Sequence, residues 1–205
     1  MKTQSNTIWF ATSNEHKRRE LAEIFAKHTI NIPSDAGIAF APKETGATFL
    51  ENALIKARAL FDIVQEPVIA DDSGLCIDAL DGRPGIFSAR YGNYGNVEGK
   101  NLLPAERNKL ILRELGDNSN RKAHFVCAMV MFLGQDRLFI AQETLEGEII
   151  REERGEGGFG YDPILLIPER GRTVAELSSA EKNRLSHRAK AGAAIGRLYG
   201  STHII

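Results

Sequence analysis

Apolar residues recur along the chain at spacings that predict a succession of strands and helices. The apolar run Thr7–Ala11 predicts a short buried strand, and the segment Glu15–Lys27 after it carries its apolar residues on one helical face. The segment Thr48–Gln65 opens with a Thr-x-x-Glu capping box and continues with apolar residues at helical spacing, which predicts a second helix. Asn52 and Lys56 are four residues apart within that helix, so both side chains should project from one further face.

The rest of the chain combines strand patterns with two more helices. The predicted elements are strands over Val68–Ala70, Leu75–Leu80, Ala123–Leu133, Arg137–Glu146 and Gly147–Arg151, long loops over Asp81–Asn96 and Gly155–Asp162, and helices over Pro104–Leu115 and Ser178–Leu198. A hairpin between two helices is typical of an α/β protein with a mixed sheet, and it argues against a strictly alternating βαβ fold.

Composition narrows the class of protein. The 42% hydrophobic and 26% charged content of the 205 residues is ordinary for a globular protein and excludes a disordered or fibrous chain. We expect a single domain over residues 1–205, built as two lobes without a separable linker. A net charge of −1 excludes a global attraction to nucleic acid or anionic membranes. We expect a cytoplasmic protein whose two cysteines, Cys76 and Cys127, are buried thiols in apolar stretches.

Two adjacent carboxylates are the first candidate for chemistry. Asp71 and Asp72 follow a predicted strand and precede Ser73 and Gly74. Carboxylates at a strand end suit a hard cation such as Mg²⁺. Because neighbouring strand residues face opposite sides, only one of the pair can readily point into a given site. The alternative is an ordinary Asx turn that closes the strand.

A polar segment between the first strand and the first helix is the second candidate. Thr12–Lys17 combines hydroxyl, amide and ammonium groups with the free amides of a helix start, a combination that binds anions. The glycines and the Lys-Ser/Thr pair of a Walker A loop are missing from it. The alternative is a simple helix cap with solvated polar residues.

Two further segments could contact a ligand. The glycine-rich loop Gly155–Asp162 includes Phe159 and Tyr161, which could stack on a base or simply pack on the core. The polar segment Glu181–Arg188 is rich in donors, although a charged run is often only a solvated helix face. Taken together, the four candidates fit one ligand, a nucleoside triphosphate with Mg²⁺.

The chain resembles the inosine triphosphate pyrophosphatase family. The matching segments are ATSNEHK (Ala11–Lys17), KETGATFLENALIKAR (Lys43–Arg58), ADDSGL (Ala70–Leu75), PGIFSARY (Pro84–Tyr91), GGFGYDP (Gly157–Pro163) and AELSSAEKNRLSHR (Ala175–Arg188). They run in the family's order over essentially the whole chain. The resemblance implies an elongated mixed β-sheet with flanking helices that form two lobes around a central substrate cleft. It also implies a homodimer.

The resemblance also implies a reaction and a set of functional residues. The reaction is hydrolysis of non-standard purine nucleoside triphosphates (ITP, dITP, XTP) to the monophosphate and pyrophosphate, a house-cleaning activity on the nucleotide pool. By resemblance, Mg²⁺ is held by Glu44 and Asp72 with support from Asp71, and Asp72 is the general base. By resemblance, the substrate is bound by Thr12, Ser13, Asn14, Glu15, His16, Lys17, Lys56, Ser73, Phe159, Gly160, Tyr161, Asp162, Lys182, His187 and Arg188.

Three departures from the family pattern and three other interpretations remain. Glu15-His16 stands where a glycine is common, Lys43 stands where a second acid is common, and Gly92–Gly99 matches no family pattern. Within the hydrolases, a related fold cleaves modified pyrimidine or 7-methylguanosine triphosphates, and a substrate panel separates the two. From another class, a nucleotide sensor without turnover would lack a metal ligand or base, whereas Glu44, Asp72 and Lys17 are all present. A purely structural α/β module would leave the polar motifs unexplained.

Overall fold

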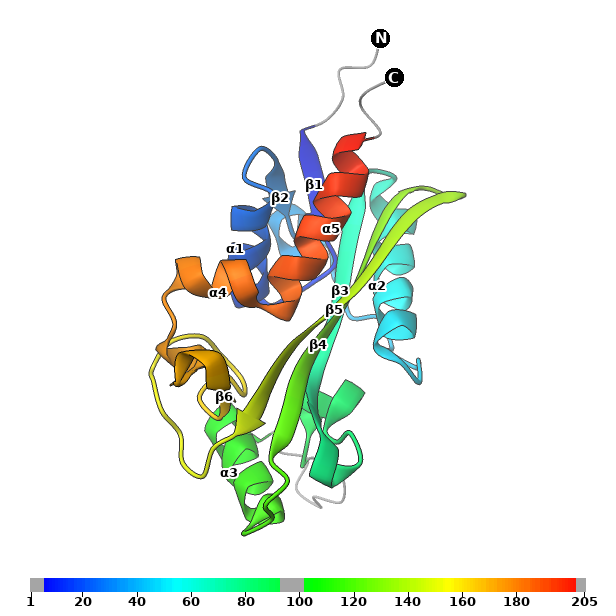
Figure 1. The fold of residues 1–205 in the computed structure, drawn as a ribbon. Helices are drawn as coiled ribbons and strands as arrows, with labels where there is room; N and C mark the ends of the chain where they lie inside the picture. Colours follow the sequence, from blue (N-terminus) through cyan, green and yellow to red (C-terminus); the bar gives the residue numbers. More distant parts are fainter. Residues whose placement is uncertain (1–5, 93–101, 202–205) are drawn as a thin grey trace. The chain divides into compact units, whose positions relative to one another are not determined.

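The computed structural model describes residues 6–92 and 102–201, with strands that form one mixed sheet. The sheet has seven strands in the order β2-β1-β3-β4-β5-β6-β7 (Figure 1). Strands β2, β1 and β3 pair in parallel, whereas β5, β6 and β7 pair antiparallel. The predicted α/β class with a mixed sheet and flanking helices is therefore confirmed.

The chain divides into two compact units, and the first comprises Met1–Asp72, Cys127–Glu143 and Ser186–Ile205. Its own elements are β1 (Thr7–Phe10), α1 (Glu15–Ile24), β2 (Thr29–Asn31), the short 3₁₀ helix η1 (Pro33–Ala36), α2 (Phe49–Val64) and α5 (His187–Ser201). It also includes parts of β3 (Val68–Ile77), β4 (Lys122–Gly134) and β5 (Arg137–Ile149).

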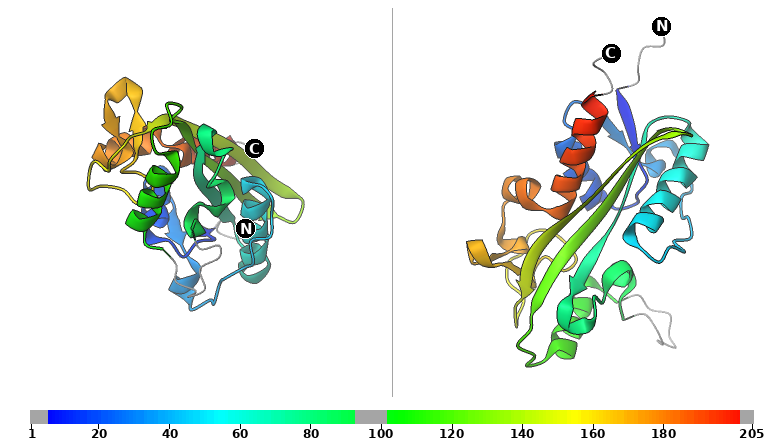
Figure 2. Two further views of the ribbon diagram at one scale, coloured as in Figure 1. Left: turned by 90° about the horizontal axis from the view of Figure 1, so that it is seen from below. Right: turned by 45° about the vertical axis from the view of Figure 1, so that its right-hand side comes forward.

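Alternation along the strands builds two apolar cores in this unit, one on each face of the sheet. Ile8 and Phe10 of β1 pack with residues of α1 and α5, whereas Trp9 packs with residues of α2. On β3, Ile69 belongs to the first core and Ala70 to the second. Figure 2 shows α5 and α2 on opposite faces of the strands. The next residues of β3 must continue this alternation.

The second unit comprises Ser73–Val126 and Thr144–Leu185. Its own elements are η2 (Asp78–Leu80), η3 (Gly85–Arg90), α3 (Pro104–Leu115), β6 (Leu165–Ile167), η4 (Pro168–Arg170), β7 (Arg172–Thr173), η5 (Val174–Glu176) and α4 (Ser179–Leu185), together with the remaining parts of β3, β4 and β5. Leu75 and Ile77 of β3, Ile111 of α3, Ile149 of β5 and Leu165 of β6 pack in its single apolar core.

Several predicted elements are confirmed with small shifts. Helix α3 has the predicted bounds, and α2 lies within the predicted segment with its capping box formed by Thr48 and Glu51. The predicted hairpin is formed by β4 and β5, which are connected by Gln135 and Asp136. Helix α1 ends three residues before the predicted Lys27, and the three-residue strands β2 and β6 and the two-residue strand β7 were not predicted.

Three predictions about elements were wrong. Val68–Ile77 is one continuous strand, not two, because it lies in the middle of the sheet between β1 and β4. Gly147–Ile149 continues β5, so the next strand of the sheet is β6. The last helix is broken at Ser186, whose hydroxyl accepts the amide of Ala189 at 3.1 Å and so caps a new helix, α5.

The remaining expectations about loops and cysteines are only partly met. Residues 93–96 of the predicted loop, and most of the unmatched segment up to Gly99, lie outside the described residues. Cys127 is buried as expected, whereas Cys76 is half-buried, and both thiols are free. Within the described ranges, every helix is too short or too polar to cross a lipid bilayer.

Candidate active site

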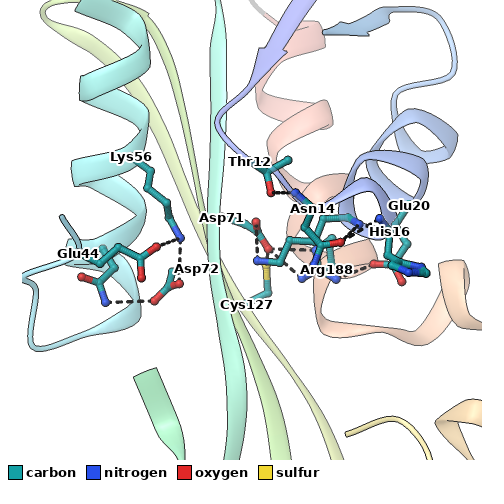
Figure 3. A network of polar contacts seen from close by, with 12 residues as sticks. Thr12, Asn14, His16, Glu20, Glu44, Lys56, Asp71, Asp72, Cys127 and Arg188 are labelled. Carbon is teal, nitrogen blue, oxygen red and sulfur yellow. Dashed lines mark hydrogen bonds and ion pairs between the residues drawn. The ribbon is translucent and has the colours of Figure 1, made fainter. Parts of the chain in front are cut away.

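The alternation of β3 sends its two adjacent carboxylates to opposite faces of the sheet. Asp71 follows the register of Ile69 toward the α1 and α5 side, and Asp72 follows Ala70 toward α2. Figure 3 shows the two side chains pointing away from each other across the strand. Both are buried, Asp71 with 1% and Asp72 with 7% of its surface exposed. Each carboxylate therefore has its own set of partners.

On the α2 side, Asp72 is part of a cluster of two carboxylates, one ammonium and one amide. Lys56 Nζ lies 3.0 Å from Asp72 Oδ1 and 2.8 Å from Glu44 Oε1. Asn52 Nδ2 donates to Asp72 Oδ2 at 3.3 Å, and Asn52 Oδ1 accepts the amide of Gly46 at 2.9 Å. The fully buried Asn52 thus ties the segment after Glu44 to Asp72. This arrangement confirms that Asn52 and Lys56 project from one face of α2.

The charges of this cluster are unbalanced, because two carboxylates share one ammonium. Burial raises the pKa of Asp72 above its ordinary value, although the charge of Lys56 opposes this shift. Burial would lower the pKa of Lys56, but the charges of Asp72, Asp71 and Glu44 raise it. Lys56 is therefore held as an ammonium, and Asp72 is a stronger proton acceptor than an exposed carboxylate.

The same cluster has the donor set of a site for a hard divalent cation. Glu44 and Asp72 already converge on a single positive group, the Lys56 ammonium, with oxygen donors of the type that Mg²⁺ prefers. Among residues 6–92 and 102–201, no three side chains of His, Cys, Asp or Glu gather closely enough to enclose a metal. A cation bound here would take its other ligands from water or from substrate oxygens, as Mg²⁺ commonly does.

On the opposite side, Asp71 is surrounded by cations. Its Oδ1 accepts from Lys17 Nζ at 3.0 Å, and its Oδ2 accepts from Arg188 Nε and Nη2 at 3.0 and 2.9 Å. The thiol of Cys127 lies 3.8 Å from Oδ2, and Glu20 Oε2 accepts from Arg188 Nη1 at 2.5 Å. Burial alone would raise the pKa of Asp71, but the charges of Lys17 and Arg188 lower it well below its ordinary value.

The start of α1 presents polar groups beside this cluster. Asn14 caps the helix, because its Oδ1 accepts the amides of His16 and Lys17 at 2.9 and 3.3 Å. The hydroxyl of Thr12 accepts the amide of Asn14 at 3.1 Å. The predicted strand-to-helix segment is thus an ordered helix cap, with the positive end of the helix dipole and the ammonium of Lys17 close together. Such a helix start favours an anion.

In the second unit, the glycine-rich loop folds around one carboxylate. Asp162 Oδ2 accepts from the amide of Phe159 at 2.7 Å and from Lys182 Nζ at 2.8 Å. Lys182 Nζ also lies 4.5 Å from the centroid of the Phe159 ring. Gly158 has φ +70°, and a Cβ there would lie 2.1 Å from Asp162 Oδ2, so only glycine fits. The loop therefore presents an aromatic ring, an ammonium and a carboxylate together.

Other contacts fix the same loop to the body of the second unit. Tyr161 is buried, and its hydroxyl donates to the carbonyl of Ser88 at 2.8 Å. Asn108 of α3 donates from Nδ2 to the carbonyl of Gly160 at 3.2 Å. Tyr161 therefore anchors the loop in the core, which is the alternative that the sequence left open for this aromatic residue.

The predicted site residues fall in both units. The first unit contains Thr12, Ser13, Asn14, Glu15, His16, Lys17, Glu44, Lys56, Asp71, Asp72, His187 and Arg188, and the second contains Ser73, Phe159, Gly160, Tyr161, Asp162 and Lys182. The structure brings together Glu44, Lys56 and Asp72, then Lys17, Asp71 and Arg188, and then Phe159, Asp162 and Lys182.

Two of the predicted site residues, Asp71 and Arg188, form an ion pair with each other. Asp71 does not share partners with Glu44, because strand alternation directs it to the opposite face of β3. Arg188, which the resemblance includes among the substrate-binding residues, is 1% exposed, and its guanidinium is paired with Asp71 and Glu20. The break at Ser186 separates α4, which carries Lys182, from α5, which carries Arg188.

Four residues with close contacts to these groups were missed by the sequence analysis. Asn52 contacts Asp72, and Glu20 contacts Arg188. Cys127 contacts Asp71, and Asn108 contacts the Gly160 carbonyl. Only Asn52 could have been found from the sequence, because it lies among apolar helix positions. A buried amide at such a position needs a hydrogen-bonding partner. The other three depend on contacts between distant segments.

The chain matches proteins of one family over nearly its whole length. Residues 8–197 match the Ham1 family. It is 49% identical over 190 residues to the dITP/XTP pyrophosphatase of Treponema denticola, covering 93% of this chain and 96% of that one. It is 45% identical over 188 residues to the dITP/XTP pyrophosphatase of Geobacillus kaustophilus, covering 90% and 89% of the two chains.

Solved structures agree with these sequence matches. The Staphylococcus aureus Ham1 protein superposes with a TM-score of 0.84 at 36% identity, covering 96% of this chain and 99% of that one. A HAM1 protein from Coxiella burnetii superposes with a TM-score of 0.83 at 39% identity, covering 95% and 98%. The family resemblance expected from the sequence motifs is confirmed by these matches. On sequence and on fold, this chain belongs to the Ham1 family.

Proposed function

We propose that this protein hydrolyses non-standard purine nucleoside triphosphates, namely ITP, dITP and XTP, to the monophosphate and pyrophosphate. The names of its relatives, dITP/XTP pyrophosphatase, support this class of reaction. The observation that carries the proposal is the cluster on the α2 side of β3. There, a buried carboxylate with a raised pKa, Asp72, shares the ammonium of Lys56 with a second carboxylate, Glu44.

The first unit supplies the groups for the triphosphate. The amides at the start of α1 and the ammonium groups of Lys17 and Lys56 complement phosphate oxygens. Thr12, Ser13 and Asn14 add hydroxyl and amide groups at the same helix start. Glu44 and Asp72 would hold Mg²⁺, which when bound neutralises charge on the phosphate oxygens.

Asp72 acts as the general base in this proposal. Its carboxylate accepts a proton from water, and the water oxygen bonds to the α-phosphorus. The bond between the α-phosphorus and the oxygen that bridges the α- and β-phosphates breaks. The electron pair of that bond leaves on pyrophosphate, whose developing charge the two lysines stabilise. A raised pKa makes Asp72 a better proton acceptor, and Lys56 and Asn52 hold its two oxygens in place.

By resemblance, groups of the glycine-rich loop and of α4 bind the nucleobase. Phe159 offers a ring for stacking, while Lys182 is an ammonium donor held against Asp162. Hypoxanthine and xanthine carry an acceptor oxygen at position six, where adenine carries an amino donor. Facing adenine, an N–H of Lys182 directed at position six would meet a second donor, and the hydrogen bond lost there costs about 1–3 kcal/mol. Base choice therefore follows from the donor character of Lys182.

Three finer properties belong to the same proposal. Mg²⁺ is the expected cofactor, because the two carboxylates provide hard oxygen donors. A homodimer and a cytoplasmic location are expected from the family resemblance in the sequence. The nucleotide is the only small-molecule partner proposed, and the near-zero net charge of −1 gives no reason to add nucleic acid or a membrane surface.

Pyrophosphate release measured over a substrate panel tests the proposal. The full chain is assayed with Mg²⁺ on ITP, XTP, dITP, ATP and GTP, with a modified pyrimidine triphosphate and 7-methyl-GTP as probes of the related fold. We expect kcat/KM for ITP to exceed that for ATP by roughly tenfold or more, the equivalent of one unpaired donor. Equal values for ITP and ATP would refute the proposed base selection, and absence of pyrophosphate from every substrate would refute the activity.

A further inference from the structure

Asp71 is a buried carboxylate of the first unit with four hydrogen-bonding contacts. It is 1% exposed, and each of its oxygens accepts from a cation, Lys17 at 3.0 Å and Arg188 at 3.0 and 2.9 Å. The thiol of Cys127 lies 3.8 Å from the oxygen that Arg188 also contacts. A carboxylate can accept only about four hydrogen bonds, so these donors occupy most of its capacity.

The two cations come from helices that are far apart in the sequence. Lys17 lies in the first turn of α1, and Arg188 is the second residue of α5. Arg188 is tied to α1 a second time through Glu20, at 2.5 Å from Nη1. Asp71 on β3 is thus the common counter-ion that joins the starts of both helices to the central strand. Within this network, two negative and two positive groups balance each other.

The side chain of Asp71 also lies on the wrong face to share a metal with Asp72. Figure 3 shows Glu44, Lys56 and Asp72 on one side of β3, with Asp71, Arg188 and Cys127 on the other. The hydrogen bonds divide in the same way, because Asp72 accepts from Asn52 and Lys56, whereas Asp71 accepts from Lys17 and Arg188. Two adjacent carboxylates on one strand therefore have separate roles.

We propose that Asp71 is a positioning residue: it holds the Lys17 ammonium and the Arg188 guanidinium at the starts of α1 and α5, and it does not ligate the metal. This role rests on the proposed function, in which Lys17 binds a phosphate of the substrate. Without Asp71, Lys17 would lose the acceptor that fixes its ammonium beside the helix start. Arg188 would remain buried beside Glu20 but without the carboxylate that accepts from its Nε and Nη2.

Direct measurement of metal binding separates this role from metal ligation. Mn²⁺ is titrated into the full chain without nucleotide, with bound metal followed by electron paramagnetic resonance, for wild type, Asp71→Asn, Glu44→Gln and Asp62→Asn. Asp62 is an exposed carboxylate of α2 and serves as the neutral control. We expect Glu44→Gln to weaken Mn²⁺ binding about tenfold or more, while Asp71→Asn stays within about twofold of wild type.

Kinetics on ITP provide the second measurement. Asp71→Asn should raise KM for ITP about tenfold, because Lys17 is no longer held in position. In the Lys17→Gln background, Asp71→Asn should lower kcat/KM much less than Asp71→Asn does in the wild-type chain. The reason is that the effects of two substitutions are not additive when one residue acts through the other. Loss of Mn²⁺ binding in Asp71→Asn comparable to that in Glu44→Gln, or full additivity with Lys17→Gln, would overturn the proposal.

A buried Arg188 that has lost the Asp71 carboxylate could prevent Asp71→Asn from folding, so a second variant keeps the test open. The double variant Asp71→Asn/Arg188→Gln removes the buried cation together with the carboxylate, and melting temperatures check each variant. It should bind Mn²⁺ as wild type does, and weakened binding would again contradict the proposal. Absence of hydrolysis by the wild-type chain would refute the proposed function instead, while the Mn²⁺ titrations would still decide whether Asp71 is a ligand.

Discussion

Asp71 and Asp72 are neighbours on one strand, but their surroundings differ in almost every respect. Asp71 is balanced by two cations, which lower its pKa against the effect of burial. Asp72 shares one ammonium with Glu44, and burial raises its pKa. Two residues of the same type, both buried and 3.8 Å or so apart along the backbone, are thus a structural counter-ion and a proton acceptor.

The difference shows how two neighbouring residues of one strand can have two different roles. Strand alternation assigns each carboxylate to a different face, and the helices on that face then decide its electrostatics. Helices α1 and α5 bring more positive than negative charge to Asp71, whereas α2 and the segment before it bring one cation and one further anion to Asp72. The comparison can be broken or sharpened by four measurements.

The largest effect is expected for Asp72→Asn. Asparagine keeps the shape of the side chain but cannot accept the proton of water, so kcat on ITP should fall by about 10²- to 10⁴-fold. The measurement is pyrophosphate release at saturating ITP, with circular dichroism to establish that the variant is folded. Asp62→Asn, which changes an exposed carboxylate of α2, serves as the matched control and should retain wild-type kcat. More than about a tenth of wild-type kcat in Asp72→Asn would remove Asp72 from the role of base.

Smaller effects are expected on the stability of the fold in metal-free buffer, and they should have opposite signs for Asp71→Asn and Asp72→Asn. Asp71→Asn removes the carboxylate that pairs with the buried Arg188 and with Lys17, and it should destabilise the fold by about 3–5 kcal/mol. The raised pKa of Asp72 means that its charged form is disfavoured by folding, so Asp72→Asn should leave the melting temperature unchanged or raise it at neutral pH. Denaturant unfolding of the two variants, compared with wild type, measures both effects.

The pH dependence of the Asp71 effect has a definite sign. Because its pKa is lower in the folded state than in the unfolded chain, the Asp71 carboxylate stabilises the fold above its unfolded pKa of about 3.9. That contribution is lost as the pH falls toward the folded value. The stability difference between wild type and Asp71→Asn should therefore be full at neutral pH and shrink below about pH 4. A difference that stays constant down to acidic pH would show that Asp71 acts through packing alone.

The smallest effect is expected for Asn52→Ala. The buried amide holds Asp72 Oδ2 and the Gly46 amide, so its removal leaves polar groups unpaired and should destabilise the fold by about 1–3 kcal/mol. The change should lower kcat on ITP about tenfold, the scale observed for partners that orient functional groups. Gln65→Ala, at the exposed end of α2, offers a control with two backbone contacts and no link to Asp72. An unchanged kcat in Asn52→Ala would mean that Lys56 alone orients the base.

Local patterns in the sequence predicted much of the fold, and the failures share a cause. Helices α2 and α3 and the hairpin were predicted because their signals, a capping box, a stripe of apolar residues and an alternating pair of strands, lie within each segment. The strand through Asp71 and Asp72 was divided in two, because a run of two aspartates, a serine and a glycine is typical of a turn. Pairing on both sides, with β1 and β4, overrides that local preference.

In the candidate site, too, the sequence predicted what depends on one element and missed what depends on contacts between distant elements. The Asn52–Lys56 spacing predicted a shared face, and strand alternation predicted that Asp71 and Asp72 would part, since both rules act within one element. The sequence alone did not indicate that Arg188, 117 residues from Asp71, would take that carboxylate as its partner.

The sequence by itself thus determined the family, the mixed α/β fold and the residue types available for chemistry. Only the tertiary structure decided which carboxylate meets which cation. The physical reason is range: helix and strand periodicities act over a few residues, whereas ion pairs form between whichever groups the packing of distant elements brings within about 4 Å.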